Sequence, residues 1–216
     1  MLSSYYEQDG ITIYHGDCAE IIETIEADIV LSDPPYGIDY NPKRSQASAA
    51  SGYRKALKKV AADDKPFDPT PLLRFPKLIL WGANNYAAKL PSSHGWFVWD
   101  KRDGGTLFPG FVASDAEMAW TNVVGRTLMY SHRWCGHLRD SERKEFWHPT
   151  QKPVALMSWC LGHVEGETVF DPYMGAGATL VAAKLAGIKA VGIEIEERYC
   201  EIAANRLRQG VLPFDG

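Results

Sequence analysis

Apolar residues in the first part of the chain form short runs separated by polar stretches. These runs lie at 11–14, 27–32, 78–81, 96–99 and 117–120. A short apolar run bounded by turn residues is typical of a strand buried in a sheet. The pattern therefore predicts a series of buried strands along this part of the chain.

Helical spacing occurs between the first two runs, where Ile21, Ile22 and Ile25 share one side of a predicted helix. Asp17 stands before them, at a place where an acidic side chain caps a first turn. We therefore expect a helix that begins after Asp17.

The last third of the chain alternates helices with strands. It predicts, in order, a helix at 154–164 with Pro153 in its first turn, a strand at 168–171, a glycine loop at 172–178, a helix at 179–186, a strand at 189–194 and a helix at 197–208. Such alternation is typical of a mostly parallel α/β sheet.

Composition favours one globular domain spanning residues 1–216. Of the 216 residues, 45% are hydrophobic and 23% are charged, which suits a chain with a sizeable core. No apolar stretch is long enough to span a membrane and no signal-peptide pattern begins the chain, so we expect a cytoplasmic protein. The cysteines are far apart, which favours buried thiols over a zinc site; they are Cys18, Cys135, Cys160 and Cys200.

An acid and two prolines end the second apolar run, in the sequence Asp33, Pro34, Pro35 and Tyr36. Proline cannot donate to a sheet and keeps the residue before it extended, so the strand should stop at Asp33. The Asp33 carboxylate and the nearby backbone carbonyls are then left without hydrogen-bond partners in the sheet. A rigid surface turn is the simpler interpretation of this stretch alone.

The glycine loop lies between two predicted strands, and Glu194 ends the second of them. Ligands of open parallel sheets bind outside the carboxyl ends of the strands, and an acid there can hold ribose hydroxyls. This pattern indicates an adenosine-type cofactor, although a tight turn without a ligand is the simpler alternative. A dinucleotide site is disfavoured, because Leu180 replaces the third glycine of its motif.

Taken together, these stretches resemble the motifs of amino-group DNA methyltransferases. "DPPY" at 33–36 and "DPYMGAG" at 171–177 are similar to the two signature motifs of that family, and "HPTQKP" at 148–153 looks like a third. The "HGDC" stretch places Asp17 at the family's adenine-contacting position. The catalytic motif precedes the cofactor loop, which is the order of the permuted beta group.

The resemblance implies a Rossmann-like S-adenosylmethionine-dependent fold, with a mostly parallel seven-stranded sheet flanked by helices. It implies methyl transfer to an exocyclic base amine, catalysed without a metal by Asp33, Pro34, Pro35 and Tyr36. The Asp33 carboxylate and the Pro34 carbonyl would accept the amine hydrogens, and Tyr36 would stack on a flipped base.

The cofactor residues implied by the resemblance come from four separate stretches. Gly175 and Gly177 would lie under S-adenosylmethionine, Glu194 would hold the ribose, and the Lys152 ammonium would face the methionine carboxylate. The complete set is Asp17, Cys18, His148, Thr150, Gln151, Lys152, Asp171, Gly175, Gly177, Thr179 and Glu194.

Two segments are candidates for contact with double-stranded DNA, although the net charge of −4 does not itself indicate a nucleic acid. The first is an expected mobile insertion at 41–65, whose residues 41–60 carry six basic side chains and no acid. The second is a short, irregular recognition region at 123–147, which leaves sequence readout either brief or shared with a second copy of the chain. The basic candidates are Lys43, Arg44, Arg54, Lys55, Lys58, Lys59, Arg126, Arg133 and Arg139. A solvated, flexible surface is the simpler interpretation of the basic insertion.

Adenine N6 is the favoured target, because cytosine-N4 enzymes more often carry serine where this chain has Asp33. Cytosine-N4 methylation is the main alternative; RNA or protein methylation and a catalytically silent nucleic-acid-binding module also stay open. Cytosine C5 methylation needs a Pro-Cys nucleophile, and none of the four cysteines follows a proline.

Overall fold

The computed structural model describes residues 3–37, 63–102, 114–135, 138–142, 147 and 150–209. Within these residues nine strands form one sheet, in the order β1-β2-β11-β10-β3-β4-β6-β5-β7. The strands are β1 (Tyr6–Gln8), β2 (Ile11–His15), β3 (Ile29–Ser32), β4 (Lys77–Trp81), β5 (Gly95–Asp100), β6 (Ala116–Thr121), β7 (Thr127–Ser131), β10 (Thr168–Asp171) and β11 (Lys189–Glu194).

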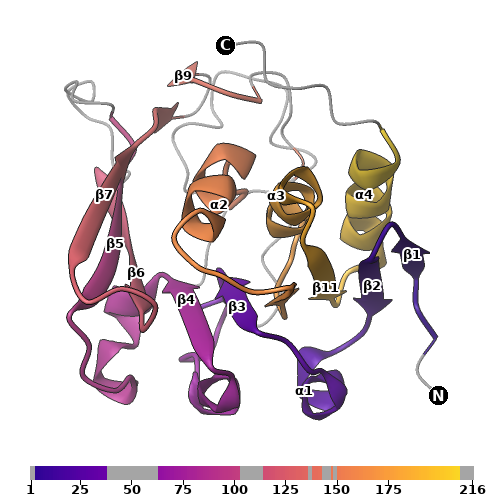
Figure 1. The fold of residues 1–216 in the computed structure, drawn as a ribbon, viewed down its shortest axis with the longest axis horizontal. Coiled ribbons are helices and arrows are strands. Elements are labelled where there is room, and N and C mark those ends of the chain that lie inside the picture. The colour runs from indigo at the N-terminus through magenta and orange to yellow at the C-terminus, as the bar shows by residue number, and fades with distance from the viewer. Residues whose placement is uncertain are drawn as a thin grey trace.

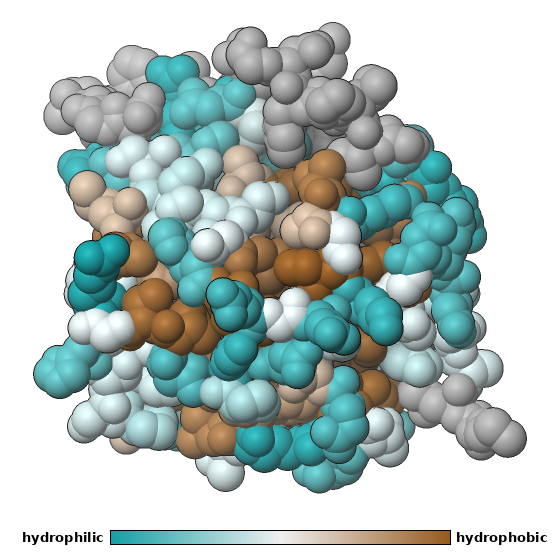
Figure 2. All heavy atoms as spheres, in the orientation of Figure 1, coloured by the Kyte–Doolittle hydropathy of each residue, from teal (hydrophilic) through white to brown (hydrophobic). Residues whose placement is uncertain are grey.

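Three helices lie side by side over one face of the sheet, as Figure 1 shows: α2 (Val154–Leu161), α3 (Ala178–Ala186) and α4 (Glu197–Arg208). Seen from the same side, polar side chains cover much of the surface and apolar atoms show between them (Figure 2). The opposite face is covered by α1 (Cys18–Ile21) and by the short 3-10 turns η1 (Ile22–Thr24), η4 (Thr70–Arg74), η5 (Ala83–Asn85) and η6 (Ala87–Lys89).

The core lies on both faces of the central strands, because successive side chains of a strand point to opposite faces. In β3, Ile29 and Leu31 pack in the cluster that contains α2, α3 and α4. Val30, between them, packs in the cluster on the other face with Phe67 and Leu72. A strand buried on both sides needs a continuous apolar run, which is why these strands are visible in the sequence.

The neighbouring strands β2, β11, β10, β3 and β4 are parallel, so their carboxyl ends meet at one edge of the sheet. Strand β6 pairs antiparallel with β4, with Trp81 opposite Ala119. The amino end of β6 therefore lies at the same edge as the carboxyl ends of the parallel strands. This geometry decides which distant residues meet there.

The mostly parallel α/β fold is confirmed, but the expected number of seven strands is wrong. The sheet also contains β1 and the edge strand β7, and the region interpreted as irregular holds β7 and a small hairpin, β8 (Trp134–Cys135) with β9 (Leu138–Arg139). Strand β7 has no buried side chain, and Met129 at its centre is 67% exposed. Leu128 and Tyr130 on either side of it are only half-buried against the core, so apolar residues occupy both faces of β7 and the sequence shows no alternation of apolar and polar positions.

Helix boundaries differ slightly from the prediction. Helix α2 ends at Leu161, and the predicted helix after Asp17 is divided between α1 and a 3-10 turn. Residues 41–62 of the predicted basic insertion lie outside the described residues. In the part of the chain that is described, no helix is long and apolar enough to cross a membrane.

Candidate active site

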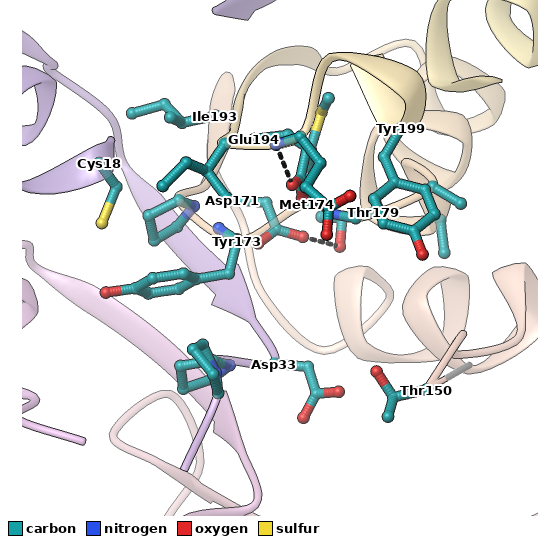
Figure 3. Close-up of a pocket in the computed structure, with 18 of the residues that line it drawn as sticks. Cys18, Asp33, Thr150, Asp171, Tyr173, Met174, Thr179, Ile193, Glu194 and Tyr199 are labelled. Carbon is teal, nitrogen blue, oxygen red and sulfur yellow. Dashed lines mark hydrogen bonds between the residues drawn. The ribbon is translucent and has the colours of Figure 1, made fainter. Parts of the chain in front are cut away.

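A pocket opens at the carboxyl edge of the parallel strands (Figure 3). Four of the acids that line it lie at strand ends: Asp17 follows β2, Asp33 follows β3, Asp171 ends β10 and Glu194 ends β11. These residues are far apart in the sequence and meet because parallel strands align their ends. The pocket thus collects the "HGDC", "DPPY" and glycine-loop stretches in one place.

Asp33 is the acid with the most charged surroundings. Its Oδ2 contacts the ammonium of Lys152, which also lies 3.0 Å from Oε2 of Glu117. Burial raises the pKa of Asp33, while the Lys152 ammonium lowers it and the Glu117 carboxylate raises it. The Oδ1 atom of Asp33 is buried and has no hydrogen-bond partner among the described residues. It is therefore an acceptor available to a ligand in the pocket.

Tyr36 follows Asp33 and packs its ring against the backbone of Gly82 at the end of β4. A Cβ at Gly82 would lie 2.3 Å from Tyr36 Cε1, so only glycine allows this approach. Burial and the Asp33 charge raise the pKa of Tyr36, which keeps the phenol neutral. The ring thus forms one wall of the pocket beside Asp33.

The Glu194 side chain is hydrogen-bonded to the glycine loop. Its carboxylate accepts hydrogen bonds from Gly175 N at 3.1 Å and from Glu196 N at 2.8 Å. Burial raises the pKa of Glu194 to about 7, although these two hydrogen bonds by themselves lower the pKa. Ile193 and Met174 supply apolar surface next to it (Figure 3). An acid beside an apolar slot suits a ribose joined to a flat ring.

Asp171 and Thr179 line the pocket, but their side chains are hydrogen-bonded to other parts of the protein. Asp171 accepts from Ser32 Oγ and from Thr179 Oγ1, both at 2.6 Å (Figure 3 shows the second). It also accepts from Tyr173 N at 3.2 Å, and burial raises its pKa to about 6. These bonds join β3, β10 and α3, so both side chains hold the glycine loop in place.

Gly177 is not among the residues that line the pocket, whereas Gly175 is. Gly177 has a φ of +78°, and a Cβ there would lie 2.8 Å from the Cβ of Ala203. The residue therefore permits the close approach of α3 and α4. The expectation that Gly177 lies directly under a cofactor does not fit this position.

The stretch before α2 lies on the other side of the pocket. Thr150, Gln151 and Lys152 line it, while His148 lies outside the described residues. Gln151 accepts from Trp147 N at 2.9 Å and donates to Glu142 at 3.3 Å, so its amide is used to fix the stretch. The Lys152 ammonium was expected to face a cofactor carboxylate; it faces two protein carboxylates instead.

Asp17 and Cys18 lie at the start of α1. The Asp17 side chain accepts from Ala19 N at 2.9 Å, which confirms the predicted N-cap. The Cys18 thiol forms a hydrogen bond with the Tyr173 side chain, and burial raises its pKa. Both residues line the pocket beside Glu194.

The candidate DNA-contacting residues divide into three groups. Arg133, which pairs with Asp140 at 2.9 Å, and Arg139, stacked 3.9 Å from the Trp134 ring centre, follow the end of β7 at the pocket edge. Arg126 precedes β7 and lies at the opposite edge of the sheet from the pocket. The third group lies outside the described residues: Lys43, Arg44, Arg54, Lys55, Lys58 and Lys59.

Glu117 and Lys101 are site residues that the sequence did not reveal. Glu117 belongs to a predicted strand, and only the antiparallel direction of β6 brings it to the pocket edge. Lys101 follows β5 and contacts Glu117 Oε1 at 2.9 Å. A charged residue at the start of an otherwise apolar strand was the one available signal.

Comparison with known proteins identifies the class. The family described as DNA methylase, which groups N6 and N4 amino-methyltransferases, matches residues 96–205. The chain therefore belongs to the N6/N4 DNA methylase family. Enzymes of this family use S-adenosylmethionine as the methyl donor.

The chain is also similar to individual proteins in sequence or fold. The chain is 23% identical to the type II methyltransferase M2.LlaDCHI of Lactococcus lactis subsp. cremoris, with 97% of this chain and 94% of the relative covered. Its fold is similar to that of M1.HpyAVI, solved as a complex with SAM (TM-score 0.56, 21% identity, 91% of this chain and 99% of that one). It is also similar to the PvuII DNA methyltransferase, described as cytosine-N4-specific (TM-score 0.57, 12% identity, 94% and 88%).

Proposed function

We propose that the protein transfers a methyl group from S-adenosylmethionine to the N6 amine of adenine in double-stranded DNA. The observation that carries this proposal is the buried Oδ1 atom of Asp33, a pocket residue, which is an acceptor without a hydrogen-bond partner among the described residues. A buried acceptor left unpaired costs stability, so a ligand donor is its natural complement.

The other half of the pocket fits an adenosine group. Glu194 would accept from the ribose hydroxyls through the lone pairs that its two backbone hydrogen bonds leave unused. Asp17 and the backbone of Cys18 would contact the adenine edge, and Ile193 and Met174 would pack on the ring. Thr150 would lie toward the methionine end.

The chemistry of the target explains the "DPPY" stretch. The lone pair of a base amine is delocalised into the ring, which makes the nitrogen a poor nucleophile. The Asp33 carboxylate and the Pro34 carbonyl would accept its two hydrogens and stabilise the positive charge that develops on the nitrogen. Tyr36 would stack on the flipped base and hold the amine in line with the methyl group, which bound S-adenosylmethionine supplies from a positively charged sulfur.

Adenine is preferred over cytosine because Asp33 stands where cytosine-N4 enzymes more often carry serine. Cytosine N4 is the second candidate, since the PvuII enzyme with a similar fold is described as specific for it. Both amines need the same acceptors. The distinction therefore rests on the one side chain at position 33.

For DNA contacts, Arg133 and Arg139 at the pocket edge and the basic residues of 41–60 would neutralise phosphates. Arg126 has no part in this proposal because it lies at the far edge of the sheet.

The test is single-turnover transfer of labelled methyl from S-adenosylmethionine to duplex DNA, followed by digestion and chromatography of the nucleosides. N6-methyladenine is the expected product. N4-methylcytosine would replace adenine as the target, and the absence of label in DNA would refute the proposal.

A further inference from the structure

Four charged side chains form a network of ion pairs in which positive and negative groups alternate, and Asp33 is its last member. Lys101 Nζ lies 2.9 Å from Glu117 Oε1, Lys152 Nζ lies 3.0 Å from Glu117 Oε2, and Lys152 also contacts Asp33 Oδ2 directly. The Lys152 side chain is 6% exposed, the lowest value of the four. These residues come from β6, from the start of α2 and from the ends of β5 and β3.

Fold stability alone does not account for this arrangement. Taking charges out of water is costly, and well-packed apolar side chains of similar volume are often at least as stable as a buried ion pair. Among the described residues, two buried oxygens of this network lack a hydrogen-bond partner. Glu117 Oε2 still lies 3.0 Å from the Lys152 ammonium, which leaves the Oδ1 atom of Asp33 as the unused acceptor. Donors and acceptors alternate along this network of ion pairs, so the group that binds Asp33 from the pocket side should be a hydrogen-bond donor.

We propose that Lys152 and Glu117 are positioning residues for the target amine. The Lys152 ammonium donates to Oδ2 of Asp33, which leaves Oδ1 as the atom that accepts a hydrogen bond from the target amine. Glu117 holds Lys152 from the neighbouring antiparallel strand and so fixes the orientation of the carboxylate. This inference rests on the proposed methyl transfer, and it assigns to Lys152 a protein partner in place of the cofactor.

The same contacts affect the charge of Asp33 in opposite directions. Its pKa is raised by burial, lowered by the Lys152 ammonium and raised by the Glu117 carboxylate. A protonated Asp33 would be a poorer acceptor, so transfer should require the ionised form. Among the described residues, the titratable or charged groups that face Asp33 from the elements packed against it are Lys152, Glu117, Lys101, Asp171, Tyr36 and Tyr86.

The test compares the pH dependence of single-turnover methyl transfer in two variants. Lys152→Gln removes the cation, so the acid limb of the profile should move to higher pH by roughly 1–3 units, the size of the effect of a close opposite charge. Glu117→Gln removes an anion and leaves the Lys152–Asp33 pair intact, so the limb should move to lower pH. A purely structural role would lower both rates without shifting the limbs in opposite directions.

Two further variants serve as controls. Lys152→Arg keeps the charge, so its acid limb should stay at the wild-type position even if the rate falls. Lys101→Gln removes an equal charge two partners further from Asp33, so its limb should move in the direction of Lys152→Gln but by less. Equal shifts in the Lys101 and Lys152 variants would refute a direct contact with Asp33.

A measurement without DNA separates this inference from the proposed function. The carbon NMR signal of the Asp33 carboxyl, assigned by its loss in Asp33→Asn, should titrate at higher pH in Lys152→Gln and at lower pH in Glu117→Gln. Unchanged titration in both variants would overturn the inference even if the wild type methylates DNA. If Lys152→Gln does not fold, the Glu117→Gln shift decides alone. Titration that shifts as expected in a wild type unable to label DNA would instead refute the proposed function.

Discussion

Replacement of Asp33 by alanine removes the buried acceptor and leaves the rest of the pocket in place. Methyl transfer should fall at least about 100-fold, as when one preorganised charge-stabilising group is removed. That factor corresponds to about 2.7 kcal/mol of lost transition-state stabilisation. Affinity for S-adenosylmethionine should stay close to that of the wild type, because Glu194 and Gly175 lie on β11 and on the loop after β10.

The structure also limits the stability cost of this change. Asp33→Ala leaves the buried Lys152 ammonium with Glu117 as its remaining partner. Removal of one partner from a buried ion pair costs about 3–5 kcal/mol, and because Glu117 still lies beside Lys152 we expect a loss of about 3 kcal/mol or less. Urea unfolding of both proteins measures this difference and shows that the variant is folded.

Asparagine at position 33 gives a sharper result. An amide keeps one carbonyl oxygen, which by itself would be expected to retain some activity. However, Lys152 requires an acceptor at the Oδ2 position, so the amide oxygen should face Lys152 and its NH2 group should face the amine. Two donors would then meet, and Asp33→Asn should be no more active than Asp33→Ala.

Single-turnover transfer of labelled methyl to duplex DNA measures all three proteins under one condition, with calorimetry of S-adenosylmethionine binding as the folding and cofactor control. An Asp33→Ala protein with the wild-type rate would refute the role of Asp33. An Asp33→Asn protein clearly more active than Asp33→Ala would show that the amide oxygen faces the pocket.

Three further predictions concern the rest of the fold and site. Glu194→Gln should weaken S-adenosylmethionine binding by about 1.5–3 kcal/mol in calorimetry, because it removes a charged acceptor. Since the pKa of Glu194 is raised from 4.5 to about 7, the folded state binds its proton more tightly than the unfolded state. Wild-type stability should therefore fall as pH rises through this interval, and urea midpoints of Glu194→Gln should lack that contribution. Gly177→Ala should cost about 1–3 kcal/mol more than Gly187→Ala in urea unfolding, because both have positive φ but only Gly177 meets another helix; equal costs would contradict the packing role. Arg133→Gln should weaken DNA binding and reduce the log–log salt slope by about one, whereas Arg126→Gln, at the far edge of the sheet, should leave both unchanged.

Much of the fold could be predicted because its central strands are buried on both faces. Their apolar runs, the alternation with helices and the glycine loop are local features, and they place Asp33, Asp171 and Glu194 at strand ends. The edge strand β7 escaped prediction because its inward residues Leu128 and Tyr130 are only half-buried and the exposed residue between them is the apolar Met129, so apolar and polar residues do not alternate. Strand count is thus predictable in the core of a sheet and not at its margins.

The sequence by itself determined which residues end the parallel strands, and parallel strands bring their carboxyl ends together whatever the rest of the chain does. Only the tertiary structure decided which residues approach that edge from other directions. Glu117 reaches Lys152 because β6 runs antiparallel to β4, and Gly177 serves helix packing because Ala203 of the neighbouring helix α4 lies against it. Strand direction and helix contacts depend on residues far apart in the chain, and no local spacing records them.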